Sequence, residues 1–383
     1  MPSLALIVVS AAIVARESAR CGVSRLVRGR LPDRGSRVTA RWLESAMGLA
    51  EGKINTVEIL GENSGTAARV RLALDADADV PAQVFLKLAP RSFLQHVMMN
   101  VVGLGMREAT FYGEAAADVP IRVPECHGVH VEPGLGRIAL VLEDLTGRAT
   151  FRDVRAGVSP AEAEAVVDAF ADLHAAFWQS PRLAAELAPL APLRRSAPVV
   201  SLAGSTLVRR ALAKPAEPVA DLIPADLVRR SRVLSEHLTD VDAFWAAQPP
   251  TLTHGDPHLG NLFFEGPRPG FLDWQVATVG PGIRDVAYFV STSMPVADAR
   301  EHERGLVARY AARLESAGVA VDAEQQWTFY RALASEAYVA ALATAGAGER
   351  MQPRDVARSG VERAAAAVQA LDTFDVLESL VLP

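Results

Sequence analysis

The N-terminal part of the chain alternates apolar and polar residues in short runs. Such runs occur at residues 57–60, 68–74 and 83–88, and polar or glycine-containing segments separate them. Successive side chains of a β-strand point to opposite faces of a sheet, so the pattern predicts three antiparallel strands in quick succession. Two further strands are predicted at residues 123–129 and 138–142. This part of the chain is therefore expected to be rich in β-structure.

Helical spacing replaces this pattern after residue 145. Val166, Phe170 and Phe177 fall on one face of a helix that is predicted to begin at Ser159, a good N-cap residue. Another helix is predicted at residues 227–247, and helices dominate the C-terminal part. The pattern predicts an α+β protein of two lobes. They are a small lobe with an antiparallel sheet at residues 38–145 and a larger, mainly helical lobe at residues 146–383.

The first 37 residues fit neither lobe. Residues 3–15 form an apolar run shorter than the roughly 20 residues needed to cross a bilayer, and the basic segment of a signal peptide is missing. Residues 16–37 are rich in arginine and glycine. We expect residues 1–37 to be an N-terminal leader, in which residues 3–15 are either an over-extended gene start or a terminal segment that packs on the body, and residues 16–37 are loose.

Composition narrows the range of partners. The 383 residues include 39 Lys and Arg against 45 Asp and Glu, which gives a formal charge of −6. This acidic balance offers no electrostatic surface for DNA or RNA and argues against a polybasic membrane-surface role. Cys21 and Cys126 do not have the spacing of a metal site, and a disulfide between them could not by itself stabilise a fold of this size. We therefore expect a protein of a reducing compartment, the cytoplasm, with no nucleic-acid or membrane partner.

The most informative stretch is residues 253–275. Two apolar segments, 262–264 and 270–272, flank a Gly/Pro turn, which predicts a β-hairpin. Because a hairpin brings its ends together, Asp256 and Asn261 at one end should approach Asp273 at the other. Their oxygen atoms suit Mg²⁺. This arrangement is typical of phosphoryl transfer, in which one Asp positions the attacking hydroxyl while the Asn and the second Asp hold the metal.

Two alternatives use the same stretch. His254, Asp256 and His258 alternate, so in a strand they would face one way and could bind Zn²⁺ or Fe²⁺ in a metal-dependent hydrolase. Pro257 interrupts that run, and no further His or Cys lies near it in sequence. The other alternative is a non-catalytic nucleotide-binding protein of the same fold, although no expected polar group is missing.

The same residues carry a family resemblance. His254-Gly255-Asp256, Asn261 and Asp273-Trp274 resemble the catalytic pattern of the aminoglycoside phosphotransferase and choline kinase group, which are small-molecule relatives of the protein kinases. The wider match at residues 272–289 is most similar to the ecdysteroid-kinase-like branch. The resemblance implies a two-lobed protein-kinase-like fold. It also implies ATP and Mg²⁺ as cofactors and a small-molecule hydroxyl as the acceptor.

The resemblance further implies roles for single residues of the helical lobe. Asp256 would be the catalytic base, or the group that orients the acceptor hydroxyl. Asn261 and Asp273 would be metal ligands. His254 would hold the loop, and Asp285 would brace it from below.

In the small lobe, the resemblance implies a set of nucleotide-binding residues. Lys87 is one of only three lysines in the chain, and it would contact the phosphates. Glu108 would pair with Lys87, with Glu114 as a competitor for that role. The other residues belong to a turn that covers the phosphates and to a hinge beside the adenine. They are Ser64, Gly65 and Thr66 in the turn and Glu143 and Leu145 in the hinge.

Overall fold

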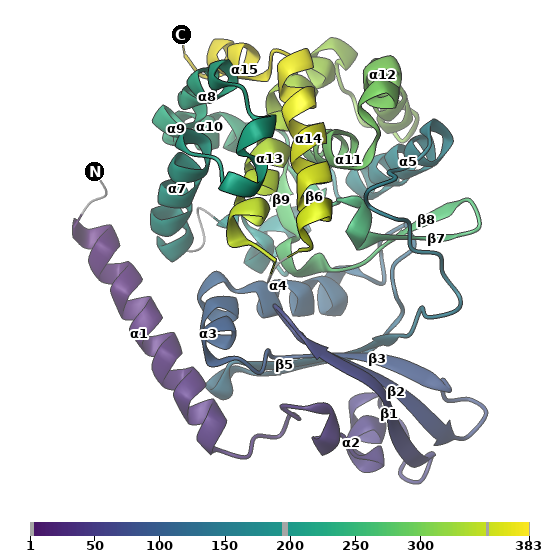
Figure 1. The fold of residues 1–383 in the computed structure, drawn as a ribbon. Coiled ribbons are helices and arrows are strands. Elements are labelled where there is room, and N and C mark those ends of the chain that lie inside the picture. The colour runs from purple at the N-terminus through teal and green to yellow at the C-terminus, as the bar shows by residue number, and fades with distance from the viewer. Residues whose placement is uncertain (1–3, 194–197, 350–351, 383) are drawn as a thin grey trace. The chain divides into compact units, whose positions relative to one another are not determined.

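The computed structural model describes residues 4–193, 198–349 and 352–382. The chain divides into two compact units, which are drawn in Figure 1. Unit 1 consists of Met1–Asp118, Val123–Arg148 and Leu193–Leu202. Unit 2 consists of Val119–Arg122, Ala149–Pro192 and Ala203–Pro383. The prediction of an α+β fold is confirmed.

Unit 1 is built on a five-stranded antiparallel sheet with the strand order β1-β2-β3-β5-β4. The strands are β1 (Ile54–Ser64), β2 (Ala68–Ala76), β3 (Gln83–Leu88), β4 (Cys126–Glu132) and β5 (Arg137–Glu143). All five strands that the sequence predicted are therefore present. β1 is longer than expected, because residues 61–64 of the predicted turn pair with β2 and only residues 65–67 form the turn.

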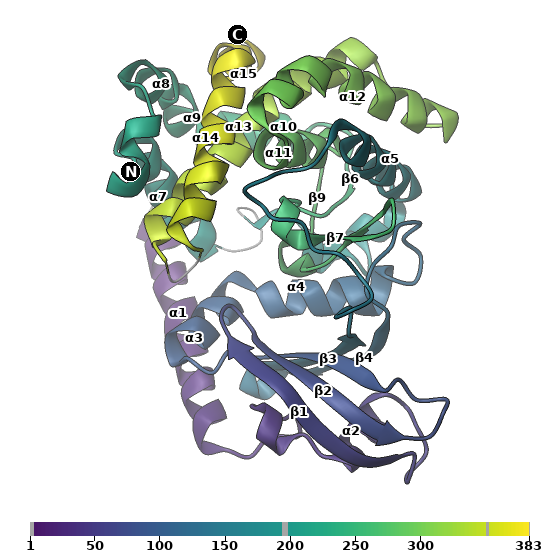
Figure 2. The same ribbon diagram turned by 45° about the vertical axis from the view of Figure 1, so that its right-hand side comes forward.

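Unit 1 also contains helices and a π-helical turn. They are α1 (Leu4–Leu26), α2 (Ala40–Ala46), α3 (Phe93–Val102), α4 (Leu104–Thr110) and the turn η2 (Phe111–Ala115). α2 lies on one face of the sheet, and α3 and α4 lie on the other (Figures 1 and 2). Thr39 is the N-cap of α2, because its hydroxyl accepts the amide N–H of Trp42 at 3.2 Å.

The alternation along β3 decides which side chains meet which helices. Val84, Leu86 and Leu88 join the apolar core beneath α2. Lys87 falls between them in sequence, so it points to the opposite face, where α4 lies. Lys87 therefore lies on the face of the sheet that α4 covers, and only 4% of its surface is exposed.

The N-terminal helix α1 was not predicted. Residues 16–26, which we expected in a loose leader, continue a helix that lies along α3 (Figure 1). The docking depends on buried Arg137 of β5, whose guanidinium donates to the Ser24 hydroxyl at 2.9 Å and to the Leu31 carbonyl at 3.2 Å. Local sequence pattern does not reveal such a distant partner. Residues 1–3 of the predicted leader lie outside the described residues.

α1 turns its polar side toward the rest of unit 1. Ser10, Glu17 and Ser24 are buried, whereas six large apolar side chains of the helix are exposed. The exposed ones are Ile7, Val8, Val9, Val14, Val23 and Leu26. Within the part of the chain that the structure describes, no helix has both the length and the apolar character that a membrane span needs.

Unit 2 is mainly helical. Its longer helices are α5 (Pro160–Ala176), α11 (Ile283–Ser293), α12 (Val296–Ser316), α13 (Ala323–Ala347), α14 (Arg354–Ala370) and α15 (Thr373–Val381). α11 is buried along nearly its whole length, and α5, α12, α13 and α14 pack around it (Figure 2). The prediction that Ser159 caps α5 is confirmed, because its hydroxyl and the Glu162 side chain form a reciprocal capping box.

One predicted helix is broken into three. Instead of a single helix at 227–247, the structure has α8 (Ala225–Arg230), α9 (Arg232–Glu236) and α10 (Leu238–Ala246). At the first break, Ser231 is buried and its hydroxyl donates to the Val228 carbonyl at 2.9 Å. Such local side-chain bonds compete with helix continuation. One further helix, α7 (Pro198–Ala213), contains the boundary between the two units.

Two short antiparallel ladders lie among the helices of unit 2. β6 (Thr251–Thr253) pairs with β9 (Thr278–Gly280), and β7 (Leu262–Glu265) pairs with β8 (Arg268–Phe271). The second ladder is the hairpin that the sequence predicted. Together the ladders hold the ends of the loop at residues 254–261.

The packing of α2 against β4 in unit 1 can be tested at Gly128. A Cβ atom there would lie 2.1 Å from the backbone oxygen of Ala46 at the end of α2. We expect Gly128→Ala to lower the free energy of unfolding by about 1–3 kcal/mol, because the backbone contact must open. Gly113→Ala is the matched control, since its Cβ would meet nothing within 4 Å. Urea denaturation followed by circular dichroism measures both, and equal midpoints for the two variants would contradict the packing.

Candidate active site

The loop at residues 254–261 is joined at its far end to the hairpin. The amide of Leu272 donates to the carbonyl of Asn261 at 3.0 Å, one residue beyond the hairpin pair Leu262–Phe271. Asp273 directly follows Leu272 in the chain. Asn261 and Asp273 are therefore neighbours, as a hairpin at this position requires.

The Asp256 carboxylate is held by two neighbours. The hydroxyl of Tyr288 donates to Oδ1 at 2.6 Å. The amide of Asn261 donates to Oδ2 at 3.3 Å and to the Asp256 carbonyl at 2.9 Å. Burial, and then the charge of Asp256, raise the pKa of Tyr288 well above its usual value, so this tyrosine stays protonated as a donor. About a third of the Asp256 side chain (32%) is still exposed, which leaves it accessible to a small molecule.

Behind the loop, Asp285 of α11 anchors two backbone amides. Its carboxylate accepts the N–H of His254 at 2.6 Å and that of Gly255 at 3.1 Å. His174 of α5 lies 3.3 Å from the same carboxylate through Nε2, and its Nδ1 is 2.9 Å from the hydroxyl of Tyr310. Burial raises the pKa of Asp285, but the bond to His174 together with the neighbouring His174, Arg284 and His254 outweighs burial, and the net shift is downward. Asp285 is thus an ionised, fully buried support of the loop.

Gly255 is fixed by its backbone as well as by Asp285. It adopts a φ of +88°, and a Cβ atom would lie 2.2 Å from the Val276 carbonyl oxygen. Only glycine meets both requirements without strain. Arg284, which precedes Asp285 in the chain, donates to the Gly255 carbonyl at 2.9 Å and pairs with Glu336 of α13.

His254 is fully buried and uses both ring nitrogens. Nδ1 accepts the amide N–H of Asp256 at 3.3 Å, and Nε2 lies 3.0 Å from the carbonyl of Leu272. Burial lowers the pKa of this imidazole below its usual value, so the ring is neutral and Nε2 carries the proton. The ring also packs against Trp274, with centroids 4.5 Å apart. His254 therefore links the loop to the hairpin end.

This geometry contradicts the hydrolase alternative. His254 has no nitrogen left for a metal, so it cannot join Asp256 and His258 as a ligand. Across the described ranges of the chain, no group of three or more His, Cys, Asp or Glu side chains is placed to hold a metal ion. His258 Nε2 lies 3.7 Å from Asp256 Oδ2, but His254 is buried against Leu272, because the three residues lie in a loop and not in a strand.

Asn261 and Asp273 remain compatible with a hard cation. The Asn261 amide N–H points to Asp256, which leaves its carboxamide oxygen as the atom for a ligand. Asp273 has a left-handed backbone (φ 66°, ψ 61°), which redirects the chain directly after the hairpin. An amide oxygen beside carboxylates is a donor set that fits Mg²⁺.

In unit 1, Lys87 and Glu108 form a buried ion pair. Lys87 Nζ lies 2.6 Å from Glu108 Oε1, and their side chains are only 6% and 2% exposed. Glu108 comes from α4, on the face to which Lys87 points. Glu114, the competitor for this position, lies in η2 and is exposed. The pair fixes the lysine side chain in one position.

The predicted turn and hinge residues lie at strand ends of the same unit. Ser64 ends β1, and its hydroxyl accepts the amide N–H of Arg91 at 3.4 Å. Gly65 and Thr66 form the turn, and the Gly65 amide donates to the Ala67 carbonyl at 2.9 Å. Glu143 ends β5 and exchanges backbone and side-chain bonds with Glu125.

The last hinge residue lies beyond β5. Leu145 is buried, and its carbonyl accepts from Arg148 at 3.1 Å.

A model of the phosphotransferase enzyme family (APH) matches residues 63–320, more than half of the chain. The chain belongs to this family. Two solved structures share its fold at a TM-score of 0.51 each. The GDP and kanamycin complex of APH(2″)-IIIa has 14% identity over 84% of this chain and 95% of its own. Choline kinase from Cryptosporidium parvum has 10% identity over 90% of this chain and 95% of its own.

These comparisons confirm the kinase-like fold that the resemblance implied. No curated protein sequence matches the chain. The closer relation to the ecdysteroid-kinase-like branch stays a prediction.

Several residues that support the site in this family member were not predicted. Tyr288 and Arg284 hold the loop at residues 254–261 from α11, and His174 reaches Asp285 from α5. Tyr288 is three residues after Asp285, so both lie on one face of the helix, and that spacing could have revealed the tyrosine. His174 is far from Asp285 in sequence, and no local pattern connects them. In unit 1, Asp144 was also missed, although it binds Arg71 of β2 at 2.9 Å.

The lowered pKa of His254 gives a prediction for the pH dependence of stability. The unfolded chain takes up a proton near pH 6.5, whereas the folded imidazole does so only at lower pH. Stability is therefore present above pH 6.5 and is lost as the pH falls, by up to about 1.4 kcal/mol per pH unit for this group. Urea denaturation between about pH 7.5 and about pH 5.5, roughly one unit on either side of the ordinary histidine pKa, should show that loss.

The matched variant is His254→Gln, whose amide can still donate to Leu272. It should be less stable at neutral pH but should have a shallower pH slope than the parent protein. Tryptophan fluorescence reports mainly on unit 2, because four of the five tryptophans lie there. An unchanged slope in His254→Gln would contradict the buried neutral imidazole.

Proposed function

We propose that this family member transfers the γ-phosphoryl group of ATP to a hydroxyl of a small molecule, with Mg²⁺ at the phosphates. The observation that carries the proposal is the braced loop, which holds Asp256 and Asn261 beside Asp273. This set offers a proton acceptor and oxygen ligands, which phosphoryl transfer requires. Membership of the phosphotransferase enzyme family supports the same reaction.

Asp256 is proposed as the catalytic base, or the group that orients the acceptor hydroxyl. Tyr288 and Asn261 restrain its two oxygens, so the carboxylate presents a fixed edge to the acceptor. Restraint of this kind favours transfer because the barrier falls when the attacking oxygen is already in line. Its partial exposure leaves room for that acceptor.

Asn261 and Asp273 are proposed as the residues that hold Mg²⁺. When bound there, the ion would neutralise charge on the transferring phosphates. The two side chains would orient the nucleotide in the process. The left-handed Asp273 backbone would keep its carboxylate next to the Asn261 oxygen.

Residues of unit 1 are proposed to bind the nucleotide. Lys87 would contact the α- and β-phosphates, with Glu108 holding its ammonium group in position. Ser64, Gly65 and Thr66 would cover the phosphates with backbone N–H groups. Glu143 and Leu145 would offer backbone groups to the adenine.

The acceptor is proposed to be a small molecule that carries a hydroxyl group. The solved structures of similar fold include a complex with kanamycin and a choline kinase, both concerned with small molecules. A requirement for ATP also supports the cytoplasmic location that the sequence predicted. Thermal shift with ATP or ADP, with and without Mg²⁺, is the direct first test. A magnesium-dependent rise supports the proposal, and no response to any nucleotide would overturn it.

Asp256→Ala should keep nucleotide binding and lose phosphoryl transfer. We expect a fall in turnover of at least about a hundredfold, because the acceptor hydroxyl loses its proton acceptor. Consumption of ATP across a library of hydroxyl compounds measures turnover, and calorimetry measures nucleotide affinity. Asp226→Ala, at an exposed position of α8, is the control. Full turnover by Asp256→Ala would disprove the assigned role, and nucleotide binding without turnover by the parent protein would favour the non-catalytic alternative.

Asp273→Asn should weaken nucleotide binding only when Mg²⁺ is present. Asparagine tolerates the left-handed backbone, so the substitution removes charge without forcing a new conformation. We expect the affinity for ATP with Mg²⁺ to fall about tenfold, while the affinity without metal is unchanged. Calorimetry with and without Mg²⁺ measures both. An equal loss in the two conditions would assign Asp273 to folding instead of metal binding.

A further inference from the structure

Exposed apolar side chains are concentrated on the helices of unit 1. Of the 14 large apolar side chains that are exposed among the described residues, 11 lie in two segments, residues 4–27 and 93–110. These segments contain α1, α3 and α4. Soluble proteins rarely expose apolar side chains in such a concentration, and where they do, the patch marks an interaction surface.

The end of α1 meets the beginning of α3. The guanidinium carbon of Arg25 lies 6.0 Å from the ring centroid of Phe93. Leu26 follows Arg25 in the chain and is 87% exposed, and Leu94 follows Phe93 and is 75% exposed. We call the surface formed by these four residues and Val23 the α1–α3 corner. Its two leucines project into solvent on either side of the contact between Arg25 and Phe93.

The charge near the α1–α3 corner is positive. Arg25 and Arg28 are exposed, and within the described residues neither forms an ion pair with an acidic side chain. Glu17, the one acidic residue of α1, is buried and pairs with Arg20. Glu132 accepts backbone amides of the segment that follows α1, at 3.0 and 3.4 Å. The positive charge of the corner is therefore not compensated within the protein.

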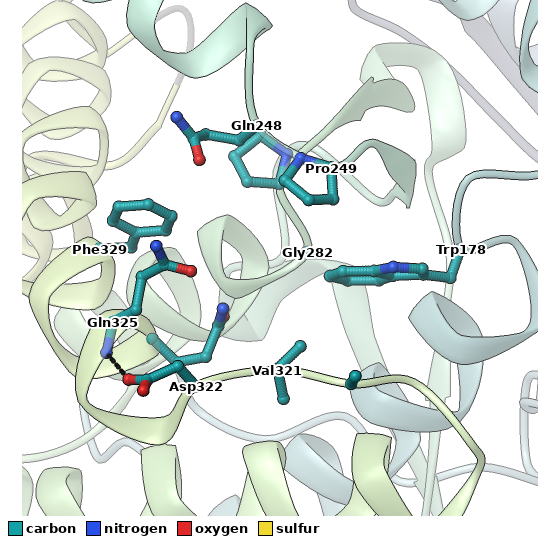
Figure 3. Close-up of a pocket in the computed structure, with 11 residues that line it drawn as sticks. Trp178, Gln248, Pro249, Gly282, Val321, Asp322, Gln325 and Phe329 are labelled. Carbon is teal, nitrogen blue, oxygen red and sulfur yellow. Dashed lines mark hydrogen bonds between the residues drawn. The ribbon is translucent and has the colours of Figure 1, made fainter.

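The corner has neither the shape of a small-molecule site nor the charge of a self-complementary interface. Small molecules bind in concave sites, such as the recess of unit 2 beside Trp178 and Val321 (Figure 3). Two copies joined through the corner would bring like charges together. Apolar side chains that project outward between arginines instead match a soft surface of negative charge, into which they can insert.

We propose that the α1–α3 corner docks this protein on a lipid bilayer that contains anionic phospholipids. Leu26 and Leu94 enter the boundary between headgroups and acyl chains, and Arg25 and Arg28 face the lipid phosphates. This contact is peripheral, so it needs no membrane-spanning helix. The proposal rests on unit 1 alone and does not depend on phosphoryl transfer.

The overall charge of the chain led us to expect no membrane partner, but a bilayer responds to local charge. At physiological ionic strength an exposed charge acts over only about 8 Å. The formal charge of −6 is a sum over 383 residues, most of which lie outside that range of any one patch. The arginines at the corner therefore determine the attraction to anionic lipid.

The test measures cosedimentation of the full chain with two kinds of vesicle. One kind contains phosphatidylcholine alone, and the other contains equal parts of phosphatidylcholine and phosphatidylglycerol. At about 0.05 M salt, partition onto the anionic vesicles should be at least about tenfold stronger, because only these attract the arginines. Salt at about 0.5 M should reduce that partition at least about fivefold.

Two matched pairs of variants assign the binding to the corner. Leu94→Gln should weaken binding to the anionic vesicles about fivefold, whereas Leu60→Gln, at an exposed position of β1, should change it less than about twofold. Arg28→Gln should also weaken binding about fivefold at low salt. Arg41→Gln removes an equal charge from α2, where the side chain is 83% exposed, and should have little effect.

Three results would overturn the proposal. The first is equal partition onto the neutral and the anionic vesicles. The second is an equal response of the corner variants and their controls, with all four variants folded by circular dichroism. The third is a chain that binds no vesicle but dimerises, with the dimer lost in Leu94→Gln, which would assign the corner to a second copy.

Discussion

A buried carboxylate, that of Asp285, fixes the backbone of the loop at residues 254–261. It accepts two consecutive backbone amides, those of His254 and Gly255, and is itself fully removed from water. Burial of an unpaired charge costs several kcal/mol, so the arrangement persists only because every side of the carboxylate is matched. His174 and Arg284 supply that compensation from two other directions. The order of the loop therefore depends on side chains that two helices, α5 and α11, place behind it.

Unit 1 also contains buried charges, in the ion pair of Lys87 and Glu108. Lys87 and Glu108 are both nearly buried, and neither would be tolerated there alone. A buried ion pair adds little net stability, but it allows very few alternative arrangements. Both units thus use buried charge to fix the direction of a side chain or a loop. Burial of these charges costs free energy. The apolar cores formed by the surrounding sheet and helices offset that cost.

Much of this could be predicted from sequence, and the reasons differ by element. Strand β2 of unit 1 follows from a period of two, because buried and half-buried residues alternate along it, whereas β5 is buried on both faces and follows from a short apolar run. The proximity of Asn261 and Asp273 follows from the hairpin, which is a local structure. Helix α1 and the contact of His174 with Asp285 could not be predicted, because both depend on partners more than a hundred residues away. The break at Ser231 depends on burial, which periodicity does not report.

The exposed apolar residues of α1 affect the tendency of the protein to self-associate in solution. Its exposed apolar residues lie beside a segment that holds five arginines and one glutamate between Arg16 and Arg30, whereas the chain as a whole is acidic. At low ionic strength, mutual repulsion between these arginines keeps two such helices apart. Salt near 0.1 M shortens the reach of that repulsion to about 10 Å, while the attraction between apolar surfaces is unaffected. Added salt would therefore favour contacts between the exposed apolar residues of two copies of α1.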